Sequence, residues 1–81
     1  MKSRIDKLEY EIEIGSINVT YFKNDSRHRD NDLPAIIYIS GTRSWHINGK
    51  RHRDNSKPST IYSDGKMEWY ENGNLIKRNF I

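Results

Sequence analysis

The sequence contains no cysteine, only two prolines and a single alanine, Ala35. Without cysteine, the chain can form neither a disulfide framework nor a cysteine-type zinc site. Its longest hydrophobic run, Ala35 to Ile39, is far shorter than the ~20 residues of a membrane-spanning helix. The polar N-terminus also lacks the apolar core of a signal peptide. We therefore expect a cytoplasmic protein with no membrane anchor, no metal and no cofactor.

The length of 81 residues is enough for one domain with a thin core. The chain holds two tryptophans, five tyrosines and eleven isoleucines, a content that disordered chains do not reach. The net charge is +3, but residues 1–16 carry four acids against three bases. The positive charge is therefore concentrated in the rest of the chain, where a polyanion or an acidic protein could bind.

A segment of 24 residues is repeated along this basic part. Residues 21–44 and 45–68 are identical at ten of 24 aligned positions. These positions are Asn24, the block Arg27 to Asn31, Pro34, Ile37, Tyr38 and Gly41 with their counterparts. A third copy starts at Trp69 and ends at Ile81. Self-similarity at a fixed period indicates one supersecondary unit copied along the chain. We therefore divide the single domain into an N-terminal hairpin (1–20), two repeats (21–44 and 45–68) and a half repeat (69–81).

Turn signals within the repeat predict β-hairpins. Asn48–Gly49, Asp64–Gly65 and Asn72–Gly73 are typical of two-residue type I′ turns, and Ser40–Gly41 and Asn24–Asp25 stand at matching positions. Pro34 and Pro58 belong to longer loops, because proline cannot donate to a strand ladder. Since no segment shows helical periodicity, we predict an all-β fold: a single antiparallel β-meander of about eight or nine short strands.

The N-terminal segment predicts the clearest strand. Leu8, Tyr10, Ile12 and Ile14 alternate with Glu9, Glu11 and Glu13, which gives one apolar and one acidic face. A lone sheet of this size buries one face poorly unless it curls or pairs with another copy. We therefore expect a homodimer.

The stretch WHINGKRHRDNSKPSTIYSDGKMEWYENGN resembles short β-repeats of bacteriophage and other viral proteins, with a recurring NGK, HR, D and P pattern. These repeats are similar in style to MORN repeats. The resemblance covers residues 21–79 and departs from the pattern at Asn55, Ser56, Ser59 and 74–76. It implies a β-array and a small phage accessory protein, and it does not imply an enzyme.

The block RHRDN admits several interpretations. His28 and Asp30, like His52 and Asp54, could form a His–Asp pair for general-base catalysis, but no nucleophile motif accompanies them. A metal site would need more ligands than His28, His52 and His46 provide, beside arginines that repel a cation. A structural role is the stronger interpretation, in which the histidines and aspartates fasten the repeats. We assign the same role to Trp45 and Trp69, in the core or in a dimer interface.

The arginines of the block suggest a binding surface. Alternation places Arg27, Arg29, Arg51 and Arg53 on the face opposite the histidines, where guanidinium pairs would suit phosphates or acidic side chains. The same basic edge would continue through Lys50, Lys77 and Arg78, with Tyr38 and Tyr62 as stacking surfaces for bases. The alternative is a solvated face with local ion pairs.

These features predict a non-enzymatic binding protein. We expect it to bind RNA or an acidic host protein, and we expect from the resemblance that it counteracts host defence, for example as the antitoxin or inhibitor of a ribonuclease toxin. The second hypothesis is a protein-interaction module without nucleic acid, which would bind its partner through exposed aromatics such as Trp45 and Tyr10 and through the acidic strand Glu9 to Glu13.

Overall fold

The computed structural model describes residues 2–5 and 10–79, and every regular element among them is a β-strand. The strands are β1 (Lys2–Ile5), β2 (Glu11–Ile14), β3 (Asn18–Lys23), β4 (Ser26–Arg27), β5 (Ile36–Tyr38), β6 (Arg43–Ser44), β7 (His46–Ile47), β8 (Lys50–Arg51), β9 (Thr60–Ile61), β10 (Met67–Glu71) and β11 (Asn74–Asn79). Eight of them form an antiparallel sheet in the order β1-β2-β3-β5-β6-β9-β10-β11, with β4 paired to β3 and with β7 and β8 forming a separate ribbon. The predicted antiparallel β-meander is thus confirmed.

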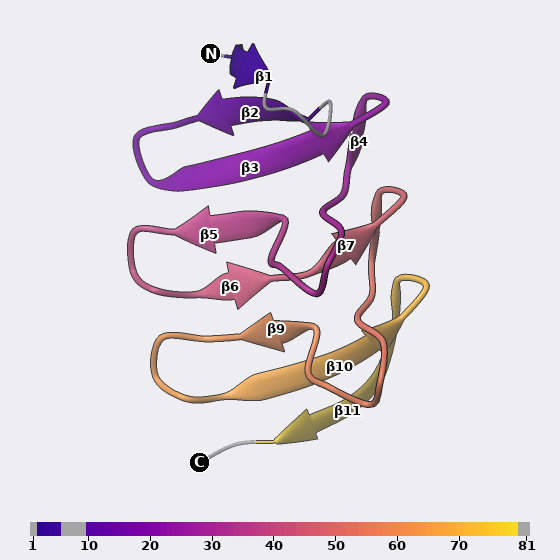
Figure 1. The fold of residues 1–81 in the computed structure, drawn as a ribbon. Helices are drawn as coiled ribbons and strands as arrows, with labels where there is room; N and C mark the ends of the chain where they lie inside the picture. The colour runs from indigo at the N-terminus through magenta and orange to yellow at the C-terminus, as the bar shows by residue number, and fades with distance from the viewer. Residues whose placement is uncertain (1, 6–9, 80–81) are drawn as a thin grey trace.

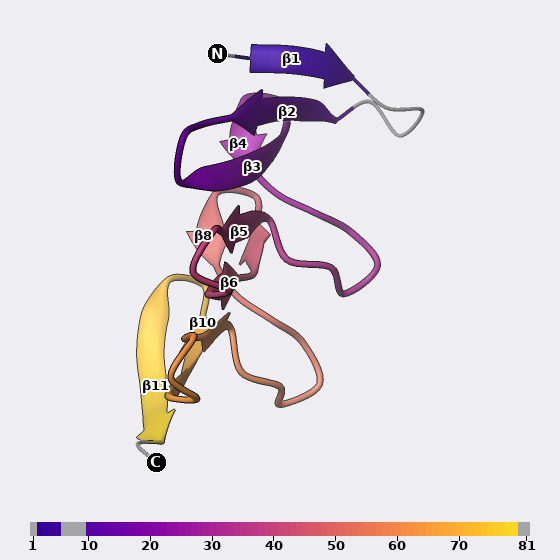
Figure 2. The ribbon, with the colours of Figure 1, turned by 90° about the vertical axis from the view of Figure 1, so that its left-hand side faces the viewer.

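Each repeat contributes one layer to a stack of hairpins. The turns β2–β3, β5–β6 and β9–β10 lie at one end of the layers, and the turns β3–β4, β7–β8 and β10–β11 lie at the other end (Figure 1). The loops that follow β4 and β8 swing out to one side of the stack (Figure 2). Equivalent strands of successive repeats are two strand spacings apart in the sheet, which is about 10 Å.

The two ends of the stack use different turns. At one end both central residues have positive φ, as at Asn48 (51°) and Gly49 (84°), which is the predicted type I′ geometry. At the other end the prediction of two-residue loops was wrong. Tyr38 N–H donates to Thr42 O and Gly41 N–H to Tyr38 O, so Ile39, Ser40 and Gly41 form a three-residue loop with only the glycine left-handed. The loop of Ser63, Asp64 and Gly65 is the same.

The described chain holds eleven strands, more than the expected eight or nine, because the strand 43–47 is split at Trp45 and because β1 is an additional strand. Trp45 N–H donates to Ser59 O, and Trp45 O accepts from His52 N–H. Both partners lie in loops, so the backbone passes here from the main sheet into the β7–β8 ribbon. β1 was not predicted, and it pairs with β2. The expected strand from Leu8 is described only from Glu11 onward, and Leu8 and Glu9 lie outside the described residues.

One face of the main sheet carries a cross-strand row of side chains that are all polar except Ile36. Strand register aligns these residues directly across seven strands: Glu13, Thr20, Ile36, Ser44, Thr60, Glu68 and Arg78. The five central members of this polar row are buried. The residues that follow Thr20, Ser44 and Glu68 point to the opposite face, where Tyr21, Trp45 and Trp69 form what we call the aromatic column. Part of the core therefore consists of hydroxyl-bearing side chains. Because these side chains are small, the strands and their neighbours can pack closely around them.

No helix that could cross a membrane occurs among residues 2–5 and 10–79.

Candidate functional site

The histidine of each RHRDN block links its own repeat to the next one. His28 Nδ1 accepts a hydrogen bond from Asn48 N–H (2.9 Å), and His52 Nδ1 accepts one from Asn72 N–H (3.1 Å). Because Nδ1 accepts, the ring proton lies on Nε2, which donates to Asp30 Oδ1 (2.7 Å) and, for His52, to Asp54 Oδ1 (2.8 Å). Each histidine therefore connects the loop of its own repeat to the turn of the following layer. This is the geometry that a fastening role requires.

Asp30 is the more deeply engaged of the two aspartates. Its carboxylate accepts hydrogen bonds from His28, from Tyr10 Oη (2.8 Å) and from Lys23 Nζ (3.0 Å), while its backbone N–H donates to Tyr10 Oη (2.6 Å). The hydrogen bond from His28, followed by those from Tyr10 and Lys23, holds the pKa of Asp30 well below its usual range. Tyr10 is only 2% exposed, and burial raises its pKa. Asp30 thus ties the N-terminal strands to the first repeat.

These contacts bear on the catalytic and metal interpretations. A histidine that acts as a general base needs a ring nitrogen that can take a proton from a substrate. In His28 and His52 both ring nitrogens are already engaged within the protein. In the part of the chain that the structure describes, no three His, Asp or Glu side chains come together to hold a metal ion.

The second arginine of each block covers the aromatic column. The Arg29 guanidinium lies 3.7 Å from the centroid of the Tyr21 ring, and that of Arg53 lies 3.8 Å from the Trp45 ring. Lys77 completes the series, with its Nζ 4.8 Å from the Trp69 ring. Each cation follows its aromatic partner by eight residues, so the repeat itself encodes a series of cation–π contacts.

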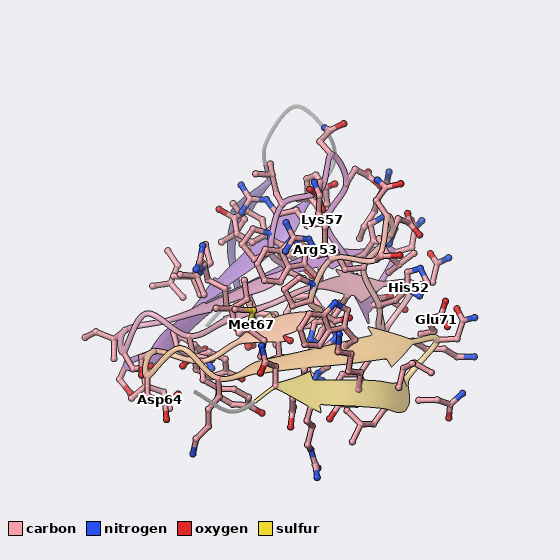
Figure 3. All side chains as sticks on the ribbon, turned by 90° about the horizontal axis from the view of Figure 1, so that it is seen from below. His52, Arg53, Lys57, Asp64, Met67 and Glu71 are labelled. Atoms are coloured by element: carbon pink, nitrogen blue, oxygen red, sulfur yellow. The ribbon has the colours of Figure 1, made fainter. Side chains whose placement is uncertain are left out.

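The same arginines close the long loops. Arg29 Nη1 donates to Pro34 O (3.2 Å) and Arg53 Nη1 to Pro58 O (3.1 Å). Arg53 also binds both carboxylate oxygens of Asp32, at 2.8 and 3.2 Å, and Lys57 Nζ lies 2.8 Å from the same group. Seen from the C-terminal end of the stack, Arg53 and Lys57 lie close together over the strands, while His52 and Glu71 lie at the opposite end of the layer from Asp64 (Figure 3).

The expectation that all four arginines share one face was wrong. β4 ends at Arg27 and β8 at Arg51, and the chain then turns into a loop, so strand alternation does not extend to Arg29 and Arg53. Lys77 and Arg78 of the predicted edge are likewise engaged within the protein. Arg78 Nε donates to Glu68 (3.0 Å), whereas Lys50 is exposed at the start of β8.

Arg27 and Arg51 are the first arginines of the two RHRDN blocks, and they differ from the second arginines in their contacts. Neither makes an ion pair with any residue that the structure describes. Both act on His46: burial first, and then the charges of Arg51 and Arg27, lower the pKa of His46 to about 4. Arg51 also lies in one pocket with Tyr38 and Tyr62. We call Arg27, Arg51, Tyr38 and Tyr62 the Arg27/Arg51 surface.

The buried pair of Ser44 and His46 was not predicted as part of a site. Ser44 Oγ and His46 Nε2 are 2.8 Å apart, and His46 Nδ1 has no hydrogen-bond partner among the described residues. The repeat alignment offered a signal, because Ser44 stands where Glu68 stands one unit later, and His46 stands where Tyr70 stands. Departures from the repeat thus mark the residues beneath the Arg27/Arg51 surface.

The chain matches no protein-family model, no curated protein and no solved structure. The resemblance to phage β-repeats therefore stays a prediction from the sequence.

Two residues assigned to partner docking in the interaction hypothesis are buried. Trp45 is 5% exposed and Tyr10 is 2% exposed, so neither ring is accessible to a partner. Trp45 instead donates from Nε1 to Asp32 O (3.1 Å), as Trp69 does to Ser56 O (3.0 Å). These bonds fasten the loop of one repeat to the aromatic column of the next, so a surface for a protein partner has to lie elsewhere.

Proposed function

We propose that this protein is a non-enzymatic RNA-binding protein whose Arg27/Arg51 surface contacts the phosphates of a single strand. The observation that carries the proposal is the division of each arginine pair. Arg29 and Arg53 each lie on a ring and donate to a proline carbonyl group. The guanidinium of Arg27 and that of Arg51, which lies on the Tyr70 ring, have neither a hydrogen-bond acceptor nor an acidic partner among the described residues. The repeat sets these two cations about 10 Å apart, and Tyr38 and Tyr62 offer aromatic rings beside Arg51.

The test is binding of a fluorescently labelled eight-nucleotide single-stranded RNA, measured by anisotropy. Replacing both arginines, Arg27→Glu/Arg51→Glu, is expected to weaken binding by about 30-fold or more, because two attractive contacts with phosphates become repulsive. For two phosphates, the logarithm of the wild-type affinity is expected to fall with the logarithm of salt concentration with a slope of about −1.4.

Arg43→Glu is the matched control, since Arg43 is exposed on the opposite face of the sheet. It makes the same change of charge away from the proposed surface and is expected to alter affinity by less than about threefold. Equal losses in the Arg43→Glu and Arg51→Glu single variants would show that only net charge matters. An absence of binding at low salt would reject the RNA proposal and leave an acidic protein as the partner to be sought.

A role against host defence rests on the resemblance alone. We propose that RNA binding serves to counteract a host ribonuclease toxin in the cytoplasm of an infected cell. Co-expression with such a toxin tests this role, and restored growth that is lost with Arg27→Glu/Arg51→Glu is the expected result. Growth restored equally by that variant would point to inhibition without RNA.

A homodimer is the second part of the proposal, and exposed isoleucines at one end of the stack support it. Ile17 is 61% and Ile39 is 82% exposed, and with Ile37 they line a shallow pocket between the β2–β3 turn and β5. Ile14 is 54% exposed at the end of β2, next to that turn. Isoleucines gathered in this way are typical of an interface, and a second copy presents the same apolar patch.

Light scattering after gel filtration is expected to give twice the chain mass of 9.6 kDa for the wild type. The variant Ile17→Asp/Ile39→Asp is expected to give the single-chain mass, because charges in the patch would be buried without partners. Leu75→Asp, at a site 40% exposed elsewhere in the stack, should remain dimeric. A wild-type monomer at high concentration would reject the dimer.

A further inference from the structure

A pocket of about 350 Å³ opens on the polar-row face between the first and second repeats. Its lining consists of Tyr38, Ser40, Thr42, Ser44, Arg51, Thr60 and Tyr62. Six of these seven side chains carry a hydroxyl group, and the seventh carries a guanidinium. The pocket therefore offers hydrogen-bond donors and one positive charge, and no carboxylate lies in its lining.

The next repeat shows what such a space accommodates. Four wall residues of the pocket, Tyr38, Ser40, Thr42 and Ser44, correspond by the 24-residue period to Tyr62, Asp64, Lys66 and Glu68. There, the Glu68 carboxylate accepts hydrogen bonds from Tyr62 Oη (2.8 Å), Tyr70 Oη (3.3 Å) and Arg78 Nε (3.0 Å). Burial raises the pKa of Glu68, but these three hydrogen bonds outweigh burial, so the pKa lies below its usual value. One layer of the stack thus holds a buried anion beside its tyrosines.

In the preceding layer the anion is missing, although the cation and the donors are present. Ser44 replaces the glutamate, and Arg51 stands where the next layer has Leu75. Arg51 rests on the Tyr70 ring with its guanidinium 4.7 Å from the centroid, and it has no acidic partner among the described residues. Thr60, directly opposite Ser44 in the sheet, is 3% exposed and its Oγ1 has no hydrogen-bond partner in the described part of the chain.

We propose that this pocket binds a phosphate group, with the phosphate oxygens in the place that the Glu68 carboxylate occupies one layer later. The Arg51 guanidinium supplies the charge and a fork of donors suited to two phosphate oxygens. The hydroxyls of Tyr38, Ser44 and Thr60 supply the neutral donors. The inference rests on the proposed function insofar as the phosphate belongs to RNA, and the same chemistry would accept a free phosphate or a terminal phosphate monoester.

The first experiment uses inorganic phosphate alone. Titration is followed by ¹H–¹⁵N correlation spectra of the full chain, and we expect saturable shifts of the Ser44, Arg51 and Thr60 amides that sodium chloride at equal ionic strength does not cause. The amides of Glu13 and Lys77, on strands that do not line the pocket, should not move. Shifts that are absent, or that fail to saturate and spread over all basic residues, would overturn the proposal.

Two variants replace a pocket residue with the residue found at the equivalent position of the next layer. Ser44→Glu introduces the carboxylate that the repeat already uses at position 68, and it should abolish phosphate binding by filling the pocket. Arg51→Leu introduces the residue found at position 75, and it should weaken phosphate binding by at least tenfold. Circular dichroism checks that each variant is folded. Ser44→Ala, which keeps the pocket open and removes one donor, covers the case in which Ser44→Glu does not fold, and it should retain saturable binding with an affinity reduced less than tenfold.

RNA with a 5′-phosphate and the same RNA with a 5′-hydroxyl distinguish the sources of the phosphate. A preference of tenfold or more for the phosphorylated strand, lost in Ser44→Glu, assigns the pocket to a terminal phosphate. Equal binding of both strands, weakened in Ser44→Glu, assigns it to a backbone phosphate. RNA binding that depends on Arg27 but is unchanged in Ser44→Glu would overturn the pocket and leave the RNA proposal intact. Saturable phosphate binding without RNA binding would retain the pocket and reject the RNA proposal.

Discussion

Trp45→Ala is expected to leave the protein unfolded or nearly so in water. The ring is the largest side chain of the small hydrophobic core at 5% exposure, and truncating a buried tryptophan to alanine costs about 3–5 kcal/mol. The variant also loses the stacking of Arg53 and the hydrogen bond from Nε1 to Asp32 O. A domain of this size has a free energy of unfolding near the low end of about 5–15 kcal/mol, so little stability would remain.

Trp69→Ala is the matched control, because the same residue type makes the same kinds of contact one repeat later. Trp69 is half-buried in the last layer and is covered by Lys77 instead of Arg53. We expect its replacement to lower the free energy of unfolding by about 1–2 kcal/mol in urea titrations followed by circular dichroism. Similar losses in both variants would contradict the central position given to Trp45.

Asp30→Ala is expected to have the second largest effect, lowering the free energy of unfolding at pH 7 by about 2 kcal/mol. The carboxylate accepts hydrogen bonds from His28, Tyr10 and Lys23, and its removal deletes all three, including the one from the buried Tyr10 hydroxyl. The side chain is 41% exposed, so solvent screening limits the effect to the lower range for charged hydrogen bonds. Asp54→Ala, at a carboxylate 76% exposed, should cost less than about 1 kcal/mol.

The pH dependence of stability provides a second measurement of Asp30. Its pKa is lower in the folded protein than the ordinary value of 3.8, so the folded state favours the charged form. The stabilisation is therefore present above about pH 4 and is lost as the pH falls below that value. The difference between wild type and Asp30→Ala should be constant from pH 5 to 7 and should shrink toward pH 2. A difference that stays constant to pH 2 would show that the carboxylate charge is not what stabilises the fold.

The repeat period accounts for how much of the fold could be read from the sequence. Glycine and asparagine at fixed positions predicted the hairpins, because few other residues adopt positive φ at low cost. Asp64–Gly65 was misjudged since a Gly that ends a three-residue loop and a Gly within a type I′ turn leave the same dipeptide in the sequence. The split at Trp45 depends on loop carbonyl and N–H groups far along the chain, which local patterns do not reveal.

The site shows a similar division. The pairing of each histidine with the aspartate two residues later could be predicted from their spacing. The different contacts of Arg27 and Arg29 could not be predicted. β4 ends between these residues, so the Arg27 side chain faces solvent and the Arg29 side chain lies on the Tyr21 ring. The pocket is found at positions where the repeats differ, and not at the residues that they share. Ser44 and Arg51 are two such positions, where one copy departs from the next.

The bond from each histidine to the turn of the next layer has a consequence for how the molecule can change in length. Since His28 and His52 bond to a backbone N–H rather than to a particular side chain, any following copy that folds as the same turn can be joined. Duplication of 24 residues in frame would add one layer and one further arginine equivalent to Arg27 and Arg51, about 10 Å along the stack. The copy number of the repeat would then set how many phosphates a bound strand can contact.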